Sequence, residues 1–443
     1  MNKKIFIILP HKDQFIKNYA GSASIWVKDF FKKTKFKNKI KIFGSTDKLK
    51  NVFIKKNYSN IKIPNIKILS KSDFYTKKLI IQCVKQKPSV VEIHNRPSYL
   101  LTIAKRFSKT NFILVIHNDP QNLRGSNTVE ERKHLLKLCY KIYFVSSWVE
   151  EKFFSGIDKN FYTNFHTIYP SIDKINKLPS KKKIIIFSGK LNAAKGFDKF
   201  AKAIIKILNK YKDWKSVIIG DEPREKYFFN HKRLIFTGWI PQDKVLNLYN
   251  DSSITVVPSL WEEPFGRSSL EAGSRGNAVI ISKKGGLPET IDNPIFLKNV
   301  TSSSIYSELN KLIKNKKLLK RLQLISFKKP LHLIKKNILI IDKHRRNILE
   351  PIKKININKN SKLKILHVFN RAEKIGGRIY FISTGKKIEN GLIRLGHDVE
   401  GISDRDVLSY NSKINARNVL NRVFLEKSLY YRPDIILMGH VNT

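Results

Sequence analysis

The stretch IIIFSGKLNAAKGFDKFAKAIIKIL, residues 184–208, contains one complete strand, turn and helix. Its apolar run Ile184–Phe187 has the length of a buried strand and is followed by Gly189. After Gly196, apolar residues recur at the i, i+3, i+4, i+7 spacing of one helix face. They are Phe197, Phe200, Ala201, Ile204, Ile205 and Leu208. A buried strand followed by an amphipathic helix is the repeating unit of a parallel α/β sheet.

The same alternation extends in both directions from this unit. Before it, we predict strands at Ile5–Leu9, Ile40–Phe43, Val90–His94, Phe112–His117 and Ile142–Ser146. After it, we predict strands at Val217–Ile219, Leu234–Phe236, Ile254–Val257 and Ala278–Ile281. Helical periodicity lies between the strands, as at Ser22–Lys33 and Glu130–Leu138. Two successive doubly wound parallel sheets are therefore expected.

The length of 443 residues exceeds one ordinary domain. We place one Rossmann-like domain at 1–170 and a second at 171–350, whose last helices are expected to pack back across both halves. A polar linker at 351–361 precedes residues 362–443, which hold only a few strands. This last part is shorter than the usual domain of ~100 residues and is interpreted as a partial, truncated Rossmann-like unit. The predicted fold class is α/β.

The chain is strongly basic, with 86 Lys and Arg against 35 Asp and Glu and a formal net charge of +51. The excess is mostly lysine and is spread evenly with Ile and Asn, which favours a general codon bias. Attraction to phosphorylated sugars, lipid headgroups or nucleic acid is the alternative. Cys83 and Cys139 lie far apart and indicate neither a disulfide framework nor a zinc site. No apolar run approaches the ~18 residues that span a bilayer, so membrane contact is expected to be peripheral.

The most informative polar cluster follows the predicted strand at Ile254–Val257. It reads Glu263-Pro264-Phe265-Gly266-Arg267-Ser268-Ser269-Leu270-Glu271. The proline and glycine predict a tight turn into a helix that begins near Arg267, and its free N–H groups suit a phosphate. Glu271, one to two turns into that helix, suits a ribose diol. The alternative is a helix whose acidic residues only stabilise its dipole.

Two further glycine turns follow strand ends. Gly189-Lys190 and Lys195-Gly196 place two lysines at the sheet edge where open α/β sheets bind ligands, so they can neutralise a diphosphate. In a chain so rich in lysine, solvated surface residues are the alternative. Gly285-Gly286 lets the backbone approach a sugar or phosphate closely, although an isolated Gly-Gly turn carries little information.

The order of these motifs along the chain resembles that in the carboxyl half of a known family. The motifs are Gly-Lys-Leu with Lys-Gly, then Glu-Pro-Phe-Gly with Glu-Ala, then Gly-Gly-Leu-Pro-Glu. The family is that of the retaining glycosyltransferases of the GT-B fold, family 4, also called glycosyl transferases group 1. The resemblance covers residues 1–345, and its specific part is 185–291. It implies two Rossmann-like domains that face a cleft holding a nucleotide diphosphate sugar. Residues 362–443 resemble the start of a second GT-B-type module.

The resemblance also implies the site residues. Lys190 and Lys195 would bind the diphosphate, and Glu271 the ribose. Glu263 and the amides of Phe265-Gly266 would bind the sugar and phosphates. Lys190 stands where the family usually has arginine, which keeps the charge but loses the bidentate fork. The catalytic candidates are His94, Glu263 and Lys195, and the donor-binding candidates are Gly21, Gly189, Lys190, Lys195, Pro264, Phe265, Gly266, Arg267, Glu271 and Gly286.

In the first half, the best candidate is His94, in the strand-end stretch Glu92-Ile93-His94-Asn95-Arg96-Pro97. It resembles the position at which a family histidine contacts the donor sugar, where it would bind a hydroxyl or polarise the reacting centre. A purely structural histidine is the alternative. Ile116-His117-Asn118-Asp119-Pro120 ends the next strand in the manner of a family loop. Gly21 alone precedes the first helix, where relatives often show paired glycines.

The sequence thus predicts a cytoplasmic enzyme at the inner face of the plasma membrane. The family resemblance implies that it moves a sugar from a UDP- or GDP-linked donor to a hydroxyl of a glycan or lipid-linked glycan. The stretch Glu92–Pro97 resembles enzymes of lipopolysaccharide and surface polysaccharide synthesis, which implies that acceptor class. No metal and no separate cofactor are expected, because fixed positive charge replaces them. The alternatives are a sugar-nucleotide epimerase or phosphorylase on the same fold, or a basic nucleic-acid-binding protein. Asp404-Arg405-Asp406 matches a metal-binding Asp-x-Asp but lacks its surroundings, so we interpret it as chance.

Overall fold

The computed structural model describes residues 3–47, 49–64, 70–107, 110–225, 227–328, 331–350, 362–371, 383–411 and 415–439. The chain divides into two compact units, Met1–Ile352 and Lys353–Thr443. The predicted linker at 351–361 lies outside the described residues. Within the described ranges, no helix combines the length and the apolar character needed to cross a bilayer.

The first unit begins with a parallel seven-stranded sheet in the order β3-β2-β1-β4-β5-β6-β7. Side chains alternate between its faces: Phe6 and Ile8 of β1 join one apolar cluster, and Ile5 and Ile7 join another. Both faces are therefore covered, which explains the uninterrupted apolar strands. The strands are β1 Ile5–Ile8, β2 Ile40–Gly44, β3 Tyr58–Asn60, β4 Val90–His94, β5 Asn111–Ile116, β6 Cys139–Phe144 and β7 Phe165–Thr167. The helices are α1 Ser22–Lys33, α2 Lys71–Gln86, α3 Pro97–Ala104, α4 Val129–Leu138 and α5 Ser147–Phe154.

A second parallel sheet of six strands follows, in the order β10-β9-β8-β11-β12-β13. Its strand order reverses between β8 and β11, which in such sheets is where a ligand binds, at the carboxyl ends of the strands. The strands are β8 Ile184–Ser188, β9 Lys215–Ile219, β10 Leu234–Phe236, β11 Ile254–Val257, β12 Ala278–Ile281 and β13 Ile295–Phe296. The helices are α6 Phe197–Lys210, α7 Gln242–Asp251, α8 Arg267–Ser274, α9 Ser302–Lys314 and α10 Lys316–Lys328.

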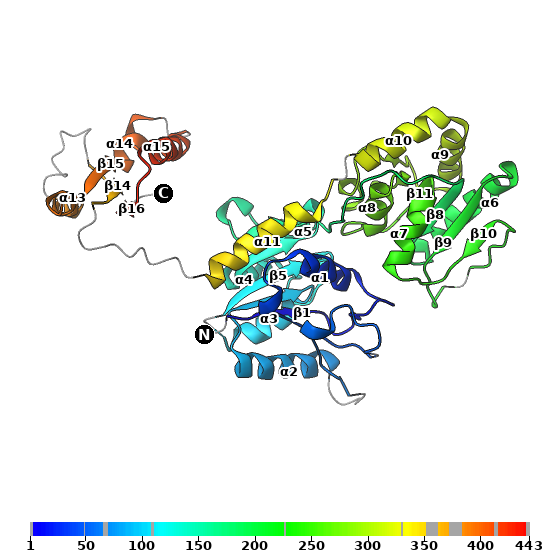
Figure 1. Cartoon of the computed structure of the whole chain (residues 1–443), viewed down its shortest axis with the longest axis horizontal. Helices are drawn as coiled ribbons and strands as arrows, with labels where there is room; N and C mark the ends of the chain where they lie inside the picture. Colours follow the sequence, from blue (N-terminus) through cyan, green and yellow to red (C-terminus); the bar gives the residue numbers. More distant parts are fainter. Residues whose placement is uncertain are drawn as a thin grey trace. The chain divides into compact units, whose positions relative to one another are not determined.

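The helix α11, Ile334–Leu349, returns from the second half to the first. It contacts α1, and Figure 1 shows it in yellow among the blue and cyan elements of the first sheet. Its side chains Ile334, Ile338 and Ile341 belong to the apolar cluster that also contains Trp26 of α1. The last helix in the sequence of this unit therefore completes the core of the first half.

The second unit contains a three-stranded parallel sheet in the order β15-β14-β16. Its strands are β14 Lys364–Val368, β15 Asp398–Ile402 and β16 Ile435–Met438. Its helices are α13 Thr384–Arg394, α14 Asp404–Tyr410 and α15 Ala416–Tyr431. The predicted α/β class, with two Rossmann-like sheets and a small third unit, is confirmed. That residues 362–443 begin a second GT-B-type module stays a prediction.

Candidate functional site

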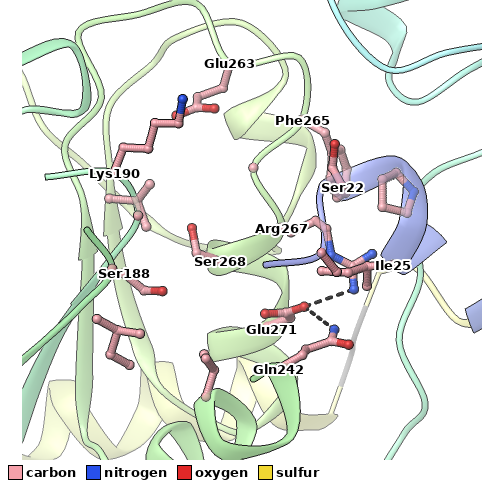
Figure 2. Close-up of a pocket in the computed structure, with 18 of the residues that line it drawn as sticks. Ser22, Ile25, Ser188, Lys190, Gln242, Glu263, Phe265, Arg267, Ser268 and Glu271 are labelled. Carbon is pink, nitrogen blue, oxygen red and sulfur yellow. Dashed lines mark hydrogen bonds and ion pairs between the residues drawn. The ribbon is translucent and has the colours of Figure 1, made fainter. Parts of the chain in front are cut away.

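A cavity of about 520 Å³ lies between the two halves of the first unit. The second half supplies the carboxyl end of β8 and the turn from β11 into α8, so the cavity lies at the switch point of that sheet. The first half supplies Ser22 and Ile25 of α1 and His117 after β5. Figure 2 shows α1 residues facing Glu271, Ser188 and Lys190 across this space. The volume is that of a typical small-molecule site.

The turn from β11 into α8 forms one wall of the cavity. Gly266, the residue before the helix, has a φ of 105°. This backbone conformation favours glycine, because a residue with a Cβ would be strained there. It lets α8 begin at Arg267, as the sequence predicts. No side chain caps this helix start, and no acidic residue lies in its first turn. Its positive end is therefore open to an anion from the cavity.

Glu271 of α8 is 6% exposed and lines the cavity. One carboxylate oxygen accepts hydrogen bonds from Gln242 Nε2 at 2.6 Å and from Arg267 Nη2 at 2.9 Å, as the dashed lines in Figure 2 show. Both bonds go to Oε1, so Oε2 is the oxygen left for a ligand hydroxyl. The carboxylate is thus held in one orientation before any ligand arrives.

Arg267 joins the two halves rather than standing free in the cavity. Its Nη2 also lies 3.1 Å from Asp29 Oδ2 of α1. Burial opposes the charge of Arg267, but Glu271 and Asp29 outweigh that effect and raise its pKa. The residue was expected to bind the donor. The structure places it in the lining with an additional task, which is to link α1 to α8.

Lys195 and Glu263 form an ion pair at the opposite side of the cavity, with 2.5 Å between Nζ and Oε1. The ammonium group also lies 4.7 Å from the centre of the Trp261 ring. Lys190 and Gly189 line the same space from the end of β8, and Figure 2 shows Lys190 on the side of Glu263. The structure therefore brings together both predicted lysines and the predicted carboxylate.

Gly286 supports this wall from behind. It is absent from the cavity lining, and its N–H donates to the carbonyl oxygen of Glu263 at 2.7 Å. A Cβ at Gly286 would lie 2.6 Å from the carbonyl oxygen of Pro264, so a larger residue would displace the turn. Gly286 thus shapes the Glu263-Pro264 backbone, and its role beside the donor stays a prediction.

His94 is fully buried and is not among the residues that line the cavity. Its Nε2 lies 3.1 Å from Glu92 Oε1, and its Nδ1 lies 2.9 Å from His117 Nε2. His117 is the histidine that reaches the cavity. Both strand-end loops could be predicted from the sequence. Which of the two histidine rings reaches the cavity could not be predicted, because that depends on how β4 and β5 pair.

Gly21 lies just outside the cavity lining, at the start of α1. Its N–H and that of Ser24 donate to the two carboxylate oxygens of Asp13, at 2.8 and 3.2 Å. A Cβ at Gly21 would lie 2.5 Å from Asp13 Oδ1. The absence of a side chain at Gly21 therefore lets the Asp13 carboxylate approach the backbone closely. Sequence reasoning missed Asp13, which lies eight residues earlier.

Two Rossmann-like sheets that face one cavity define the fold class of the first unit, and comparisons with known proteins agree with it. The family described as glycosyl transferases group 1 matches residues 169–328. The Bacillus subtilis protein YtcC is 26% identical over 46% of this chain and 58% of its own length. The lipopolysaccharide 1,2-N-acetylglucosaminetransferase of Salmonella typhimurium is 23% identical over 52% of this chain and 65% of its own length. The chain therefore spans less than two thirds of these curated relatives.

Among solved structures, Anabaena HepE in complex with UDP-glucose superimposes with a TM-score of 0.62 at 13% identity, over 77% of this chain and 99% of that one. The sucrose-phosphate synthase of Thermosynechococcus elongatus gives a TM-score of 0.63 at 13% identity, over 78% of this chain and 99% of that one. Residues 169–328 thus match the group 1 glycosyltransferases, family 4, and the fold is that of the GT-B class.

Proposed function

We propose that this protein transfers a sugar from a nucleotide diphosphate donor to a hydroxyl acceptor with retention of anomeric configuration. The carrying observation is the cleft wall that joins an uncapped helix start, two lysines and a buried, oriented Glu271. These groups match the chemistry of a nucleoside diphosphate: positive charge and N–H groups for phosphates, and a fixed carboxylate for a ribose diol. HepE, a fold relative, is described in complex with UDP-glucose, which supports a UDP-linked donor.

The proposed catalysis is electrostatic. Lys190, Lys195 and the N–H groups of α8 stabilise the departing diphosphate as charge develops on it. When the diphosphate binds Lys195, the ion pair between Lys195 and Glu263 breaks. Glu263 is then available to bind the sugar. The leaving phosphate accepts the proton of the incoming hydroxyl. Because the cleft is bounded by both halves, their approach around the donor would exclude water that otherwise hydrolyses it.

We further propose a lipid-linked acceptor in surface polysaccharide synthesis, reached by contact with an anionic membrane. The helix α2 exposes Ile81 and Val84, which are 54% and 57% exposed. Lys77 and Lys85 are exposed four residues to either side of Ile81, on the same helix face. Apolar side chains flanked by lysines suit a surface of acidic lipids. The Salmonella relative, named for a lipopolysaccharide reaction, supports this acceptor class.

A thermal-shift series with UDP- and GDP-sugars tests the donor site. A bound donor at 100 times its Kd should stabilise the protein by about 2.7 kcal/mol. Glu271→Ala should abolish the shift, whereas Glu151→Ala, an exposed carboxylate on α5, should leave it intact. Equal shifts in both variants would place the donor elsewhere.

Product analysis separates the alternatives. A transferase leaves the donor sugar's stereochemistry unchanged and forms a glycoside only when an acceptor is supplied. An epimerase would change the sugar without an acceptor, and a phosphorylase would require inorganic phosphate. Binding to unrelated oligonucleotides that weakens steeply with salt, without any nucleotide-sugar shift, would favour the nucleic-acid alternative.

Vesicle flotation tests the membrane contact. The full chain should float with vesicles of acidic phospholipid and remain unbound to neutral ones. Ile81→Glu with Val84→Glu should reduce flotation, while Leu339→Glu, an exposed apolar residue on α11, should not. Flotation that is unaffected by the double substitution would contradict the proposal for α2.

A further inference from the structure

Five side chains from both halves of the first unit form a closed ring of hydrogen bonds and ion pairs. Gln242 Nε2 and Arg267 Nη2 both donate to Glu271 Oε1, at 2.6 and 2.9 Å. Arg267 Nη2 also lies 3.1 Å from Asp29 Oδ2, and Asp29 Oδ1 lies 2.9 Å from Lys28 Nζ. Lys28 Nζ donates to Gln242 Oε1 at 2.5 Å, which closes the ring. Two members belong to α1 and three to α7 and α8.

The chemistry of its members gives every bond in this ring one direction. The ammonium of Lys28 and the guanidinium of Arg267 only donate, and an ionised carboxylate only accepts. The amide of Gln242 does both, so its oxygen must face Lys28 and its NH₂ group must face Glu271. Burial lowers the pKa of Lys28, and the neighbouring Asp29 counteracts that effect. A member that turns away therefore leaves each of its two neighbours short of one bond.

The ring lies between two cavities. Arg267 and Glu271 line the cavity proposed for the donor, whereas Lys28 and Asp29 line a second cavity of about 340 Å³. Gln242 lines both cavities. The α1 side of the ring thus borders open space rather than packed core, so its side chains have room to separate from the second half.

A second set of contacts between the halves involves the backbone. The two carboxylate oxygens of Glu289 accept from the N–H groups of Ser147 and Trp148 at the start of α5, at 2.7 and 2.9 Å. Ser146 Oγ donates to the carbonyl oxygen of Pro264 at 2.5 Å. These contacts do not involve any member of the ring. Loss of the ring would therefore leave the two halves joined at α5.

We propose that Lys28 and Asp29 of α1 are positioning residues that hold Glu271 in the orientation that binds the ribose. They act through Gln242 and Arg267, each of which connects one α1 residue to Glu271 Oε1. The assignment rests on the proposed function for its ligand and on the ring for its geometry. Lys28 and Asp29 thereby contribute to nucleotide affinity although neither lines the donor cavity.

The double variant Lys28→Met with Asp29→Leu removes both α1 members of the ring. It takes away one positive and one negative charge, so Arg267 and Glu271 still neutralise each other. The matched control is Lys32→Met with Asp243→Leu. Both control positions are exposed and line the second cavity, but neither is a member of the ring. The two double variants therefore have the same net charge and change the same cavity.

The measurement is calorimetric titration of the full chain with UDP and GDP, each compared with the analogue that lacks both ribose hydroxyls. Wild type and control should bind the ordinary nucleotide about tenfold more tightly than the analogue, because only the former donates to Glu271. In the ring variant the Kd of the ordinary nucleotide should rise about tenfold, because a smaller fraction of the protein holds Glu271 in the binding orientation. The Kd of the analogue should stay unchanged.

The comparison of the two nucleotides separates positioning from a merely structural role. A disturbed fold would weaken both nucleotides equally, since it does not distinguish the ribose hydroxyls. An equal loss for both nucleotides, or an unchanged preference in a folded ring variant, would overturn the proposal.

A readout without ligand distinguishes this proposal from the proposed function. Asp29 and Gln242 are not bonded to each other in the ring, so the losses of Tm in Asp29→Leu and Gln242→Leu should add unless the ring acts as a unit. We expect the combined variant to lose less than the sum, because either substitution alone opens the ring. Additive losses would overturn the ring. A less than additive loss in a protein that binds neither nucleotide would support the ring and contradict the proposed function instead.

Discussion

The two sheets of the first unit share one strand order through their sixth strand, yet the helix starts that border the cleft differ. In the first half, Asp13 occupies the N–H groups at the start of α1. In the second half, α8 begins at Gly266 with no side-chain cap and no acid in its first turn. The two sheets share one architecture, but the helix start in the first half is occupied by a carboxylate and the one in the second half is free for an anion. The difference explains why the phosphates of a donor are assigned to the second half.

The largest effect is expected from removing positive charge in the second half. Lys190→Ala with Lys195→Ala should lower kcat/KM by about 10² or more, because nothing else at the end of β8 would neutralise the leaving diphosphate. Steady-state kinetics with the best donor of the thermal-shift series measure this. The control is Lys202→Ala, an exposed lysine on α6. Equal activity in the double variant and the control would show that these lysines are only solvated.

Removing the carboxylate from the start of α1 in the first half should have a smaller effect, and the effect should be on stability. Asp13→Ala leaves the N–H groups of Gly21 and Ser24 without their acceptor and should lower the free energy of unfolding by about 1–2 kcal/mol. Sulfate should recover part of this loss relative to wild type in the same salt, since the helix start then binds an anion. Urea unfolding measures both. Asp73→Ala, which removes an exposed acid in the first turn of α2, should cost less and show no sulfate effect.

Acid should destabilise the first half through a histidine of α11. His344 Nδ1 contacts the Tyr143 hydroxyl at 2.8 Å, and burial followed by Lys141, His166 and Lys343 lowers its pKa from 6.5 to about 4. Its folded pKa is the lower one, so its contribution to stability is complete above pH 6.5 and is lost as the pH falls toward 4. His344→Phe should therefore show a smaller fall in Tm across this window than wild type. His134→Phe, at an exposed position, should follow the wild-type profile.

The smallest effect is expected at the contact between the halves. Tyr19 of the first half stacks on Trp239 of the second, with ring centroids 4.8 Å apart and an angle of 24°. Tyr19→Ala should lower the free energy of unfolding by about 0.5–1.5 kcal/mol, the usual value of such a pair. Tyr19→Phe should retain it. A donor KM that rises only in the alanine variant would show that the stack also favours the closed cleft.

The sequence predicted the central strands because each is buried on both faces and therefore reads as an uninterrupted apolar run, as in Ile254–Val257. It did not predict the edge strands Tyr58–Asn60, Phe165–Thr167 and Ile295–Phe296, which are two or three residues long and only partly buried. Such strands are defined by their pairing partners rather than by their composition.

The candidate site likewise has one part that could be predicted from the sequence and one part that could not. The Glu263–Glu271 turn is local, so its glycine and helix start could be predicted from neighbouring residues. The bond between Asp13 and Gly21 and the ion pair between Arg345 and Glu92 join residues that only the tertiary fold brings together. Arg345 lies 253 positions from Glu92, and no pattern in the sequence signals that pair.

The return of α11 to the first sheet also limits how this protein can be recombined. A chimaera that exchanges the second half at the inter-sheet connection, and takes α11 from the incoming parent, would leave Glu92 buried opposite a foreign helix. Losing one partner of a buried ion pair typically costs about 3–5 kcal/mol. Donor-swapping chimaeras should therefore cross over twice, once before β8 and again before α11, so that each parent's last helix stays with its own amino-terminal half.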